Sequence, residues 1–168
     1  MGCILDLKTT IDVSNRLVFN KEKIVFTHGA FDLFHIGHAA LLKESKKKGD
    51  FLVVGLESDE RIYKYKNKGR PVISLRERMK IVAENRWADF VFPIDDNTQL
   101  NERFYVDLYI SLKPNVVTCG KHFSFKEQFV KRDKHTLLEK VKFSSISHSY
   151  DEVQSTTNII NKIKNVSC

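Results

Sequence analysis

The chain has 168 residues, of which 42% are hydrophobic and 11% aromatic, and 28 Lys and Arg outnumber 21 Asp and Glu to give a net charge of +7. This composition supports one domain with a buried core and excludes disorder as the main state. The longest nearly uninterrupted apolar stretch, Phe51 to Leu56, is far shorter than the ~20 residues of a membrane-spanning helix, and the N-terminus lacks the order of a signal peptide, so we expect a cytoplasmic protein without a membrane partner.

Short apolar runs alternate with amphipathic stretches along the chain. Runs typical of buried strands occupy 23–27, 51–56, 90–94, 116–119 and 141–146. Helical periods or capping residues indicate helices over 37–48, 59–65, 75–85, 100–112, 136–140 and 155–164. This alternation predicts an α/β fold, a Rossmann-like doubly wound sheet of about five parallel strands with helices on both faces. We treat 1–168 as a single domain, with 1–22 as an N-terminal helical arm and 23–164 as the core.

The basic excess is concentrated in one window of the chain. Residues 61–80 contain eight basic side chains and one acid, a net +7 that equals the charge of the whole chain. A high isoelectric point alone suggests nucleic acid as a partner. A strip this short suits a smaller ligand, such as one polyphosphate, while a solvated helix face with a loop is the alternative without a function.

The first predicted strand runs into a loop with the sequence Thr27-His28-Gly29-Ala30-Phe31-Asp32-Leu33-Phe34-His35-Ile36-Gly37-His38. This is neither a Walker A loop nor the G-x-G-x-x-G dinucleotide turn. Gly29 would let the backbone turn close to a ligand, and the N-terminus of the next helix offers N–H groups and partial positive charge to a phosphate. His35 and His38 lie one helical turn apart, so each can donate a hydrogen bond to a phosphoryl oxygen, and Gly37 leaves room for it.

Two other interpretations of the histidines compete with phosphate binding. A metal pair is one, but two histidines without a third ligand in a fixed register are a weak zinc site. The cysteines Cys3, Cys119 and Cys168 form no C-x-x-C pair that could complete it. Structural histidines packed at a strand-to-helix turn are the other. The combination of strand, glycine, histidine pair and helix start favours phosphate binding, and we predict no metal site formed by the protein.

The pattern Gly29-x-Phe31-Asp32-x-x-His35-x-Gly37-His38 resembles the signature of the cytidylyltransferase-like nucleotidyltransferases. The resemblance continues through Gly69-Arg70-Pro71-Val72, Leu75-x-x-Arg78-Met79 and Ser155-Thr156-Thr157-Asn158-Ile159-Ile160. Within this family, the chain is most similar to the adenylyltransferase half of bacterial ADP-heptose synthase. Glycerol-3-phosphate and ethanolamine-phosphate cytidylyltransferases come next.

The resemblance implies an enzyme whose catalytic core transfers a nucleoside monophosphate from a nucleoside triphosphate, with ATP favoured. The acceptor would be a phosphorylated sugar such as heptose 1-phosphate, and the products a nucleotide-activated sugar and pyrophosphate. The alternative is a CTP-dependent cytidylyltransferase acting on glycerol 3-phosphate or another alcohol phosphate. Mg²⁺ would arrive with the triphosphate. The expected partners are these two small molecules and a second copy in a homodimer, without nucleic acid.

The resemblance also assigns roles to residues. His35 and His38 would hold the α- and β-phosphates, Lys66 would close over the α-phosphate or the attacking group, and Arg78 would reach the β,γ end. Asp32 would fix the loop through backbone hydrogen bonds rather than act as a base. The nucleotide-binding set is Gly29, Ala30, Phe31, Asp32, Gly37, Ser155, Thr156 and Thr157. Lys121 and His122 would suit an anionic acceptor.

Several of these roles have simpler alternatives. Arg78 could pair only with a neighbour on its helix, and Ser155 and Thr156 could be a plain helix cap. The stretch 149–154 has no arginine where cytidylyltransferases carry one, which favours ATP, whereas 86–91 resembles a cytidylyltransferase segment. A non-catalytic nucleic-acid or nucleotide-binding domain that uses the 61–80 strip is the competing class of function.

Overall fold

The computed structural model describes residues 1–66, 69–94, 102–120, 140–147 and 155–166. Six parallel strands form one sheet in the order β1-β4-β3-β2-β5-β6. The strands are β1 (Cys3–Ile4), β2 (Ile24–Gly29), β3 (Phe51–Glu57), β4 (Phe90–Ile94), β5 (Val116–Gly120) and β6 (Lys142–Ile146). The helices are α1 (Leu7–Phe19), α2 (Ile36–Lys46), α3 (Asp59–Tyr65), α4 (Leu75–Ala83), α5 (Glu102–Leu112) and α7 (Thr156–Val166).

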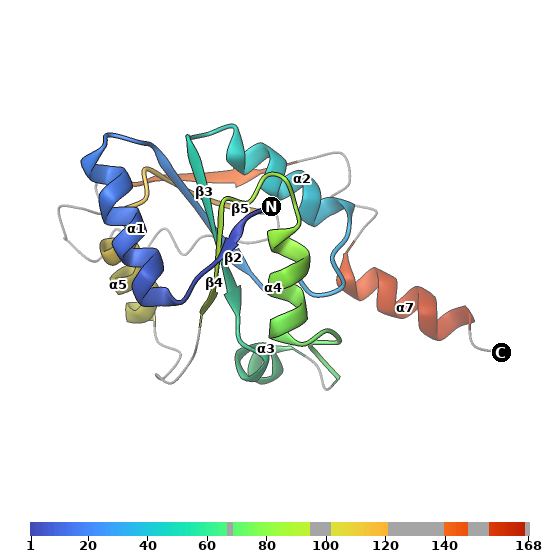
Figure 1. Ribbon diagram of the computed structural model, residues 1–168. Helices are drawn as coiled ribbons and strands as arrows, with labels where there is room; N and C mark the ends of the chain where they lie inside the picture. Colours follow the sequence, from blue (N-terminus) through green and yellow to red (C-terminus); the bar gives the residue numbers. More distant parts are fainter. Residues whose placement is uncertain (67–68, 95–101, 121–139, 148–154, 167–168) are drawn as a thin grey trace.

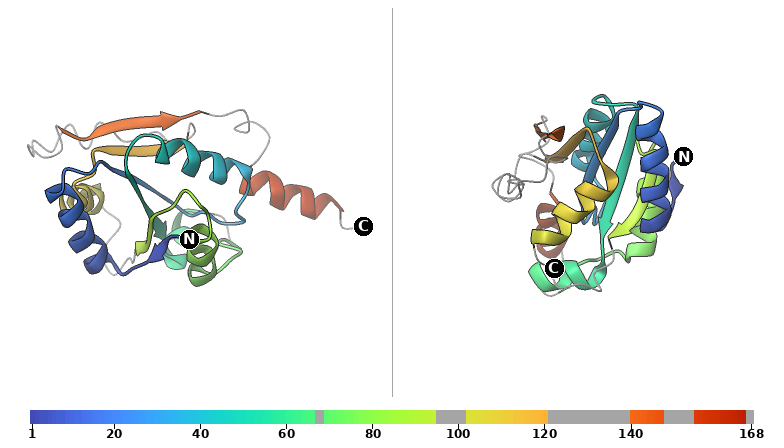
Figure 2. Two further views of the ribbon diagram at one scale, coloured as in Figure 1. Left: turned by 45° about the horizontal axis from the view of Figure 1, so that its top comes forward. Right: turned by 90° about the vertical axis from the view of Figure 1, so that its left-hand side faces the viewer.

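Helices cover both faces of the sheet (Figures 1 and 2). One face buries Phe26, Val53 and Phe92 against α1 and α5. The other face buries Val25 and Val54, with their neighbours, against α2 and α4. Both faces are apolar because strands of a parallel sheet are covered on two sides. The predicted doubly wound α/β fold is therefore confirmed.

The N-terminal residues are more closely integrated than the predicted helical arm. Helix α1 packs Leu7, Ile11 and Leu17 against the core, and β1 adds an edge strand beside β4. The edge strand accounts for the sixth strand, where about five were expected. The predicted short helix at 136–140 lies almost entirely outside the described residues. No helix in the described part of the chain is long and apolar enough to cross a membrane.

Short polar caps set the start of the helices that follow the carboxyl ends of strands. The Ser58 hydroxyl accepts a hydrogen bond from the Arg61 N–H at the start of α3. Ser74 is the N-cap of α4, as expected: its hydroxyl accepts from the Glu77 N–H at 3.4 Å and donates to the Glu77 carboxylate at 2.6 Å, whereas the reciprocal bond of a capping box, from the Ser74 N–H to that carboxylate, is not among the bonds of the described residues. In a doubly wound sheet, the carboxyl ends of the strands form the ligand-binding edge. The loops after β2 and β3 meet at this edge.

Candidate active site

The loop between β2 and α2 has a constrained backbone. Strand β2 ends at Gly29, and α2 begins at Ile36 with His35 as its N-cap residue. Between them, Phe31 and Leu33 have positive φ angles of 49° and 45°. Such angles cost non-glycine residues roughly 1–3 kcal/mol each and persist only where the surroundings impose them. The loop is therefore held in shape by contacts with other segments.

Asp32, between these two residues, supplies several of the contacts. Its buried carboxylate accepts hydrogen bonds from the N–H groups of Val72 and Ile73 at 3.0–3.1 Å. The same carboxylate forms an ion pair with Arg70, whose Nε lies 2.7 Å away. Burial raises the pKa of this carboxyl, but the backbone bonds and Arg70 outweigh burial and lower the pKa overall. Asp32 is thus an ionised anchor for the loop, the role predicted for it.

Arg78 is fully buried, and its guanidinium joins three segments. Nε donates to the Ile73 carbonyl at 3.0 Å, and the terminal nitrogens donate to the carbonyls of Ala30 and Glu57 and to the Asp59 carboxylate. Because these donors are directed at protein acceptors, the structure supports a positioning role for Arg78. Its predicted contact with the β,γ end of a triphosphate would require these bonds to break.

The two signature histidines stack on each other at the start of α2. Their ring centroids lie 3.8 Å apart with an interplanar angle of 24°. His35 Nδ1 accepts a hydrogen bond from the Gly37 N–H at 3.1 Å, so the neutral ring carries its proton on Nε2. An Nε2–H group is the kind of donor that can bind a phosphoryl oxygen. Gly37, between the two histidines in sequence, is buried.

His38 is packed by aromatic rings rather than held by hydrogen bonds. Phe31 and Phe34 lie 5.2 and 5.5 Å from its ring, and its buried Nδ1 has no hydrogen-bond partner among the described residues. Burial, together with the neighbouring His35, lowers the pKa of His38 to about 3. His38 is therefore neutral at physiological pH, so it presents a polar imidazole rather than a cation.

Helix α7 starts against the signature loop. The Thr156 hydroxyl donates to the Asp32 carbonyl oxygen at 2.8 Å, and Ser155 caps the helix by accepting from the Asn158 N–H at 3.1 Å. Thr157 is exposed. Both hydroxyls thus have protein partners, as in the capping alternative. The bond to Asp32 also brings the N-terminus of a second helix close to that of α2, and both ends favour anions.

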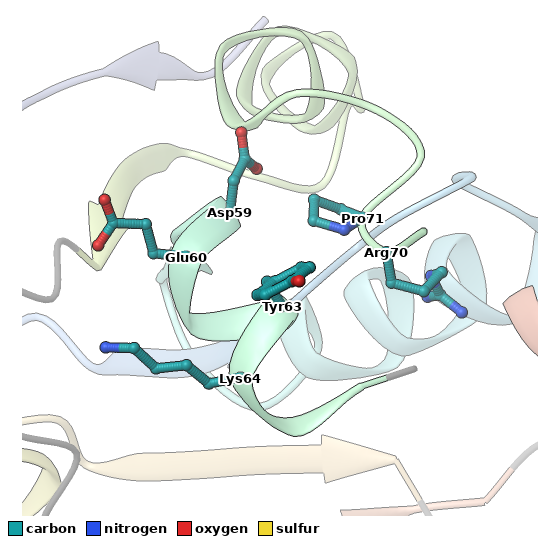
Figure 3. A pocket seen from close by; sticks show the side chains of 6 residues that line it. All are labelled: Asp59, Glu60, Tyr63, Lys64, Arg70 and Pro71. Carbon is teal, nitrogen blue, oxygen red and sulfur yellow. The ribbon is translucent and has the colours of Figure 1, made fainter. Parts of the chain in front are cut away.

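Lys66 lies at the end of α3, where its side chain is exposed and its Nζ is 5.4 Å from the Tyr65 ring centroid. A cavity of about 400 Å³ lies between α3 and the segment that leads to α4. Figure 3 shows Tyr63 facing Pro71 across this cavity, with Arg70 pointing away from it. Since Arg70 also binds Asp32, the cavity wall is tied directly to the signature loop.

The other predicted site residues are Gly29 and Ala30, at the end of β2, and the acceptor pair Lys121 and His122. Gly29 is half-buried, and a Cβ there would meet only the Phe31 ring at 3.7 Å. Packing among the described residues therefore does not require glycine at this position. Ala30 contributes its carbonyl to Arg78. Lys121 and His122 lie outside the described residues.

Arg70, Asp59 and His28 also lie at or beside the site, although no sequence pattern predicted a site role for them. Arg70 belongs to the Gly69-Arg70-Pro71-Val72 segment. The spacing of that segment from Asp32 in the sequence did not predict that the two side chains would pair. Asp59 was expected only as the first residue of a helix. His28 is part of the signature stretch but has no helical partner, so periodicity did not single it out.

A family model described as cytidylyltransferase-like matches residues 26–162. The chain belongs to the cytidylyltransferase-like family. The predicted family and its enzyme class, the nucleotidyltransferases, are thereby confirmed.

Curated relatives carry the name bifunctional protein HldE. The chain is 36% identical over 159 residues to the protein from Campylobacter fetus and 31% identical over 161 residues to that from Helicobacter acinonychis. These alignments cover 92% and 96% of the chain but only 31% of each relative. The chain thus spans about a third of the length of these relatives, as expected for similarity to one part of a larger protein.

Solved structures show the same fold. A lipopolysaccharide core biosynthesis protein from Thermoplasma volcanium superposes with a TM-score of 0.62 at 28% identity, covering 75% of this chain and 97% of the other. A pantoate-beta-alanine ligase from Francisella tularensis has a TM-score of 0.59 at 18% identity, covering 98% of this chain and 78% of the other. The second similarity concerns the fold alone.

Proposed function

We propose that the protein transfers a nucleoside monophosphate, with ATP as the favoured donor, to a phosphorylated sugar such as a heptose 1-phosphate. A phosphate oxygen of the acceptor forms a bond to the α-phosphorus, and the bond between that phosphorus and the bridging oxygen of pyrophosphate breaks. The electron pair of the broken bond leaves with pyrophosphate. The attacking phosphate is already ionised near neutral pH, so no protein base is required.

The observation that carries this proposal is the stacked pair of neutral histidines at the N-terminus of α2. Phosphoryl transfer needs positioning and charge stabilisation more than covalent chemistry. The Nε2–H of His35 would donate to an oxygen of the α- or β-phosphate, where negative charge develops, and His38 would bind beside it. The anchored loop keeps these donors in place without reorganisation.

The remaining residues would act around this pair. The first turn of α7, at Ser155, Thr156 and Thr157, would receive the terminal phosphates. Lys66 would move over the α-phosphate, because it is exposed at the end of a helix beside a loop. Arg78 would act as a positioning residue that holds Ala30 and the end of β3.

We propose that Mg²⁺ is bound through the triphosphate. Among the described residues, no group of three His, Cys, Asp or Glu side chains could hold a metal ion. The signature carboxylate of Asp32 is engaged with Arg70 and two backbone N–H groups. When bound, the ion would neutralise phosphate charge, and the protein's part would be to orient the chelated triphosphate.

The basic window 61–80 does not form one exposed strip, which weighs against a nucleic-acid-binding domain. The side chains of Arg61, Arg70 and Arg78 are 11%, 10% and 0% exposed, and each pairs with a carboxylate. Non-specific binding of nucleic acid depends on exposed cations that neutralise phosphates. The predicted homodimer and cytoplasmic location stay predictions.

The test is a pyrophosphate-release assay that crosses ATP and CTP with heptose 1-phosphate, glycerol 3-phosphate and ethanolamine phosphate, with and without Mg²⁺. We expect release that requires ATP, Mg²⁺ and the sugar phosphate together. Release with CTP and an alcohol phosphate alone would favour the cytidylyltransferase alternative. Absence of release with every pair, from protein whose folding is verified by thermal unfolding, would refute the proposed function.

A further inference from the structure

A second group of polar side chains lies at the carboxyl edge of the sheet, on the face that α5 covers. At its centre is Glu57, the last residue of β3, which is 3% exposed. Its carboxylate accepts hydrogen bonds from the hydroxyls of Tyr65 and Tyr105, and Arg61 Nε lies 3.7 Å from it. We refer to Glu57, Arg61, Tyr65, Tyr105 and the adjacent His28 as the Glu57 cluster.

Within this cluster, the Tyr105 ring already has two stacking partners from the protein. The guanidinium carbon of Arg61 lies 4.8 Å from the ring centroid, and the His28 ring lies 4.5 Å from it at an angle of 26°. An aromatic ring next to a carboxylate is the arrangement that recognises alkylammonium groups. In this protein, the guanidinium of Arg61 takes the place next to Tyr105 and Glu57 that such an alkylammonium group would take.

The charges of the cluster are balanced. Burial and the nearby Arg61 lower the pKa of His28 to about 3, so His28 is neutral. Burial and the neighbouring Glu57 raise the pKa values of Tyr65 and Tyr105, so both phenols stay protonated. The cationic Arg61 and the anionic Glu57 remain, paired with each other. A cationic ligand group would meet Arg61 without an unpaired anion in the cluster to compensate.

The cluster adjoins the signature loop, and the geometry of the proposed reaction relates it to the acceptor. His28 directly precedes Gly29, and the carbonyl of Glu57 is held by the same arginine as that of Ala30. In-line displacement puts the attacking oxygen and the leaving pyrophosphate on opposite sides of the phosphorus. With pyrophosphate towards the α2 side, the non-phosphate part of the acceptor would point to the α5 side.

We propose that Arg61 determines acceptor specificity: seated on Tyr105 and paired with Glu57, it excludes cationic alcohol phosphates and restricts the acceptor to phosphates whose remaining part is uncharged and hydroxylated. The groups around Arg61 are neutral and polar: the Tyr105 hydroxyl donates to Glu57, and the imidazole of His28 is hydrogen-bonded to the Tyr109 hydroxyl. This inference rests on the proposed transferase function and adds the class of acceptor.

The experiment compares kcat/KM for a sugar 1-phosphate and for ethanolamine phosphate in the wild type and in the double variant Glu57→Gln/Arg61→Gln. The double substitution removes both charges, so no unpaired buried charge is left to unfold the protein. We expect the wild type to prefer the sugar phosphate at least ~100-fold, because opposing like charges cost several kcal/mol at an interface. In the double variant, the preference for the sugar phosphate should shrink at least ~10-fold, because the Tyr105 ring could then contact the ammonium group of ethanolamine phosphate. A factor of ~10 is about the contribution of one cation–π contact.

Lys64→Gln is the matched control, since it removes one exposed charge from the same helix and should leave the preference unchanged. Arg61→Lys, which keeps the charge but loses the planar contact, should retain exclusion of the cation. Equal use of both acceptors by the wild type would overturn the specificity role while the transferase function stands. A variant that loses activity equally with both acceptors would overturn it too, and no turnover with any acceptor would overturn both proposals.

Discussion

The signature loop and the Lys66 segment lie at the same edge of the sheet but are held very differently. Around the loop, Asp32 and Arg78 direct their polar groups at backbone atoms of distant segments, and both side chains are buried. The Lys66 side chain is exposed at the end of α3, and among the described residues its ammonium group makes no hydrogen bond. The difference is between a loop fixed by buried polar contacts and a cation on an exposed side chain, and it matches the roles that we propose for them.

The largest expected effect is the loss of stability in the variant Arg78→Met, which removes a contact that holds the signature loop. Removal of the guanidinium leaves the buried carbonyls of Ala30 and Glu57 without their donor, so stability should fall by about 3–5 kcal/mol. Urea unfolding measures this change. Arg76→Met, on the exposed side of the same helix, should change stability by less than about 0.5 kcal/mol. A similar small change for both variants would show that Arg78 does not anchor the loop.

Next in size is the kinetic effect of His35→Ala. Loss of one preorganised donor to the transferring phosphoryl group should lower kcat by ~10²- to 10³-fold. The melting temperature should stay close to that of the wild type, since the ring is only half-buried and its bond to Gly37 is local. Steady-state pyrophosphate release gives kcat, and thermal unfolding provides the control. A variant with nearly wild-type kcat would remove His35 from the site.

Acid should weaken the rigid region through its buried histidines. The pKa values of His28 and His38 are lowered to about 3, so between that value and the ordinary one near 6.5 only the unfolded chain takes up these protons. The stability that these neutral histidines contribute is therefore fully present above about pH 6.5. It is lost as the pH falls, by about 2 kcal/mol per histidine at pH 5.

Urea unfolding at pH 7 and pH 5 measures this loss, and His38→Gln should remove about half of the pH dependence, since it removes one of the two groups. Stability that is equal at both pH values, or greater at pH 5, would contradict burial of neutral imidazoles.

The smallest of these effects concerns the exposed region. Lys66→Ala should leave stability within about 0.5 kcal/mol of the wild type, as most surface substitutions do. It should lower kcat by roughly tenfold, since an exposed cation that closes over the phosphate acts mainly in the transition state. Lys64→Ala, which removes an exposed lysine two residues earlier, is the control, and it should leave both stability and kcat unchanged. Equal kinetics for the two variants would show that Lys66 does not reach the nucleotide.

The elements of the fold were largely predictable because apolar period and polar caps mark them locally. The bounds of α3 (Asp59–Tyr65) and β4 (Phe90–Ile94) agree with the pattern. Strand β1 was not foreseen, since two residues carry no period and their pairing depends on β4, far along the chain.

The chemistry of the signature was also visible, but the roles of the arginines were not. Whether a guanidinium faces a ligand or the protein depends on neighbours that the fold brings together. Arg78 bonds to Ala30 and Glu57, 48 and 21 residues away in sequence. Arg70 reaches Asp32 across 38 residues. Charge counting placed both in one basic strip, whereas the folded chain buries them as anchors.

The most direct test of the proposed reaction follows the oxygen atoms. The acceptor sugar phosphate is prepared with ¹⁸O in its phosphate and incubated with ATP, Mg²⁺ and the protein, and the products are analysed by mass spectrometry. Attack by the acceptor phosphate on the α-phosphorus predicts that all the label is retained in the nucleotide-activated sugar and that pyrophosphate is unlabelled. Label in released phosphate or pyrophosphate, or formation of free AMP without a labelled nucleotide-sugar, would contradict the account.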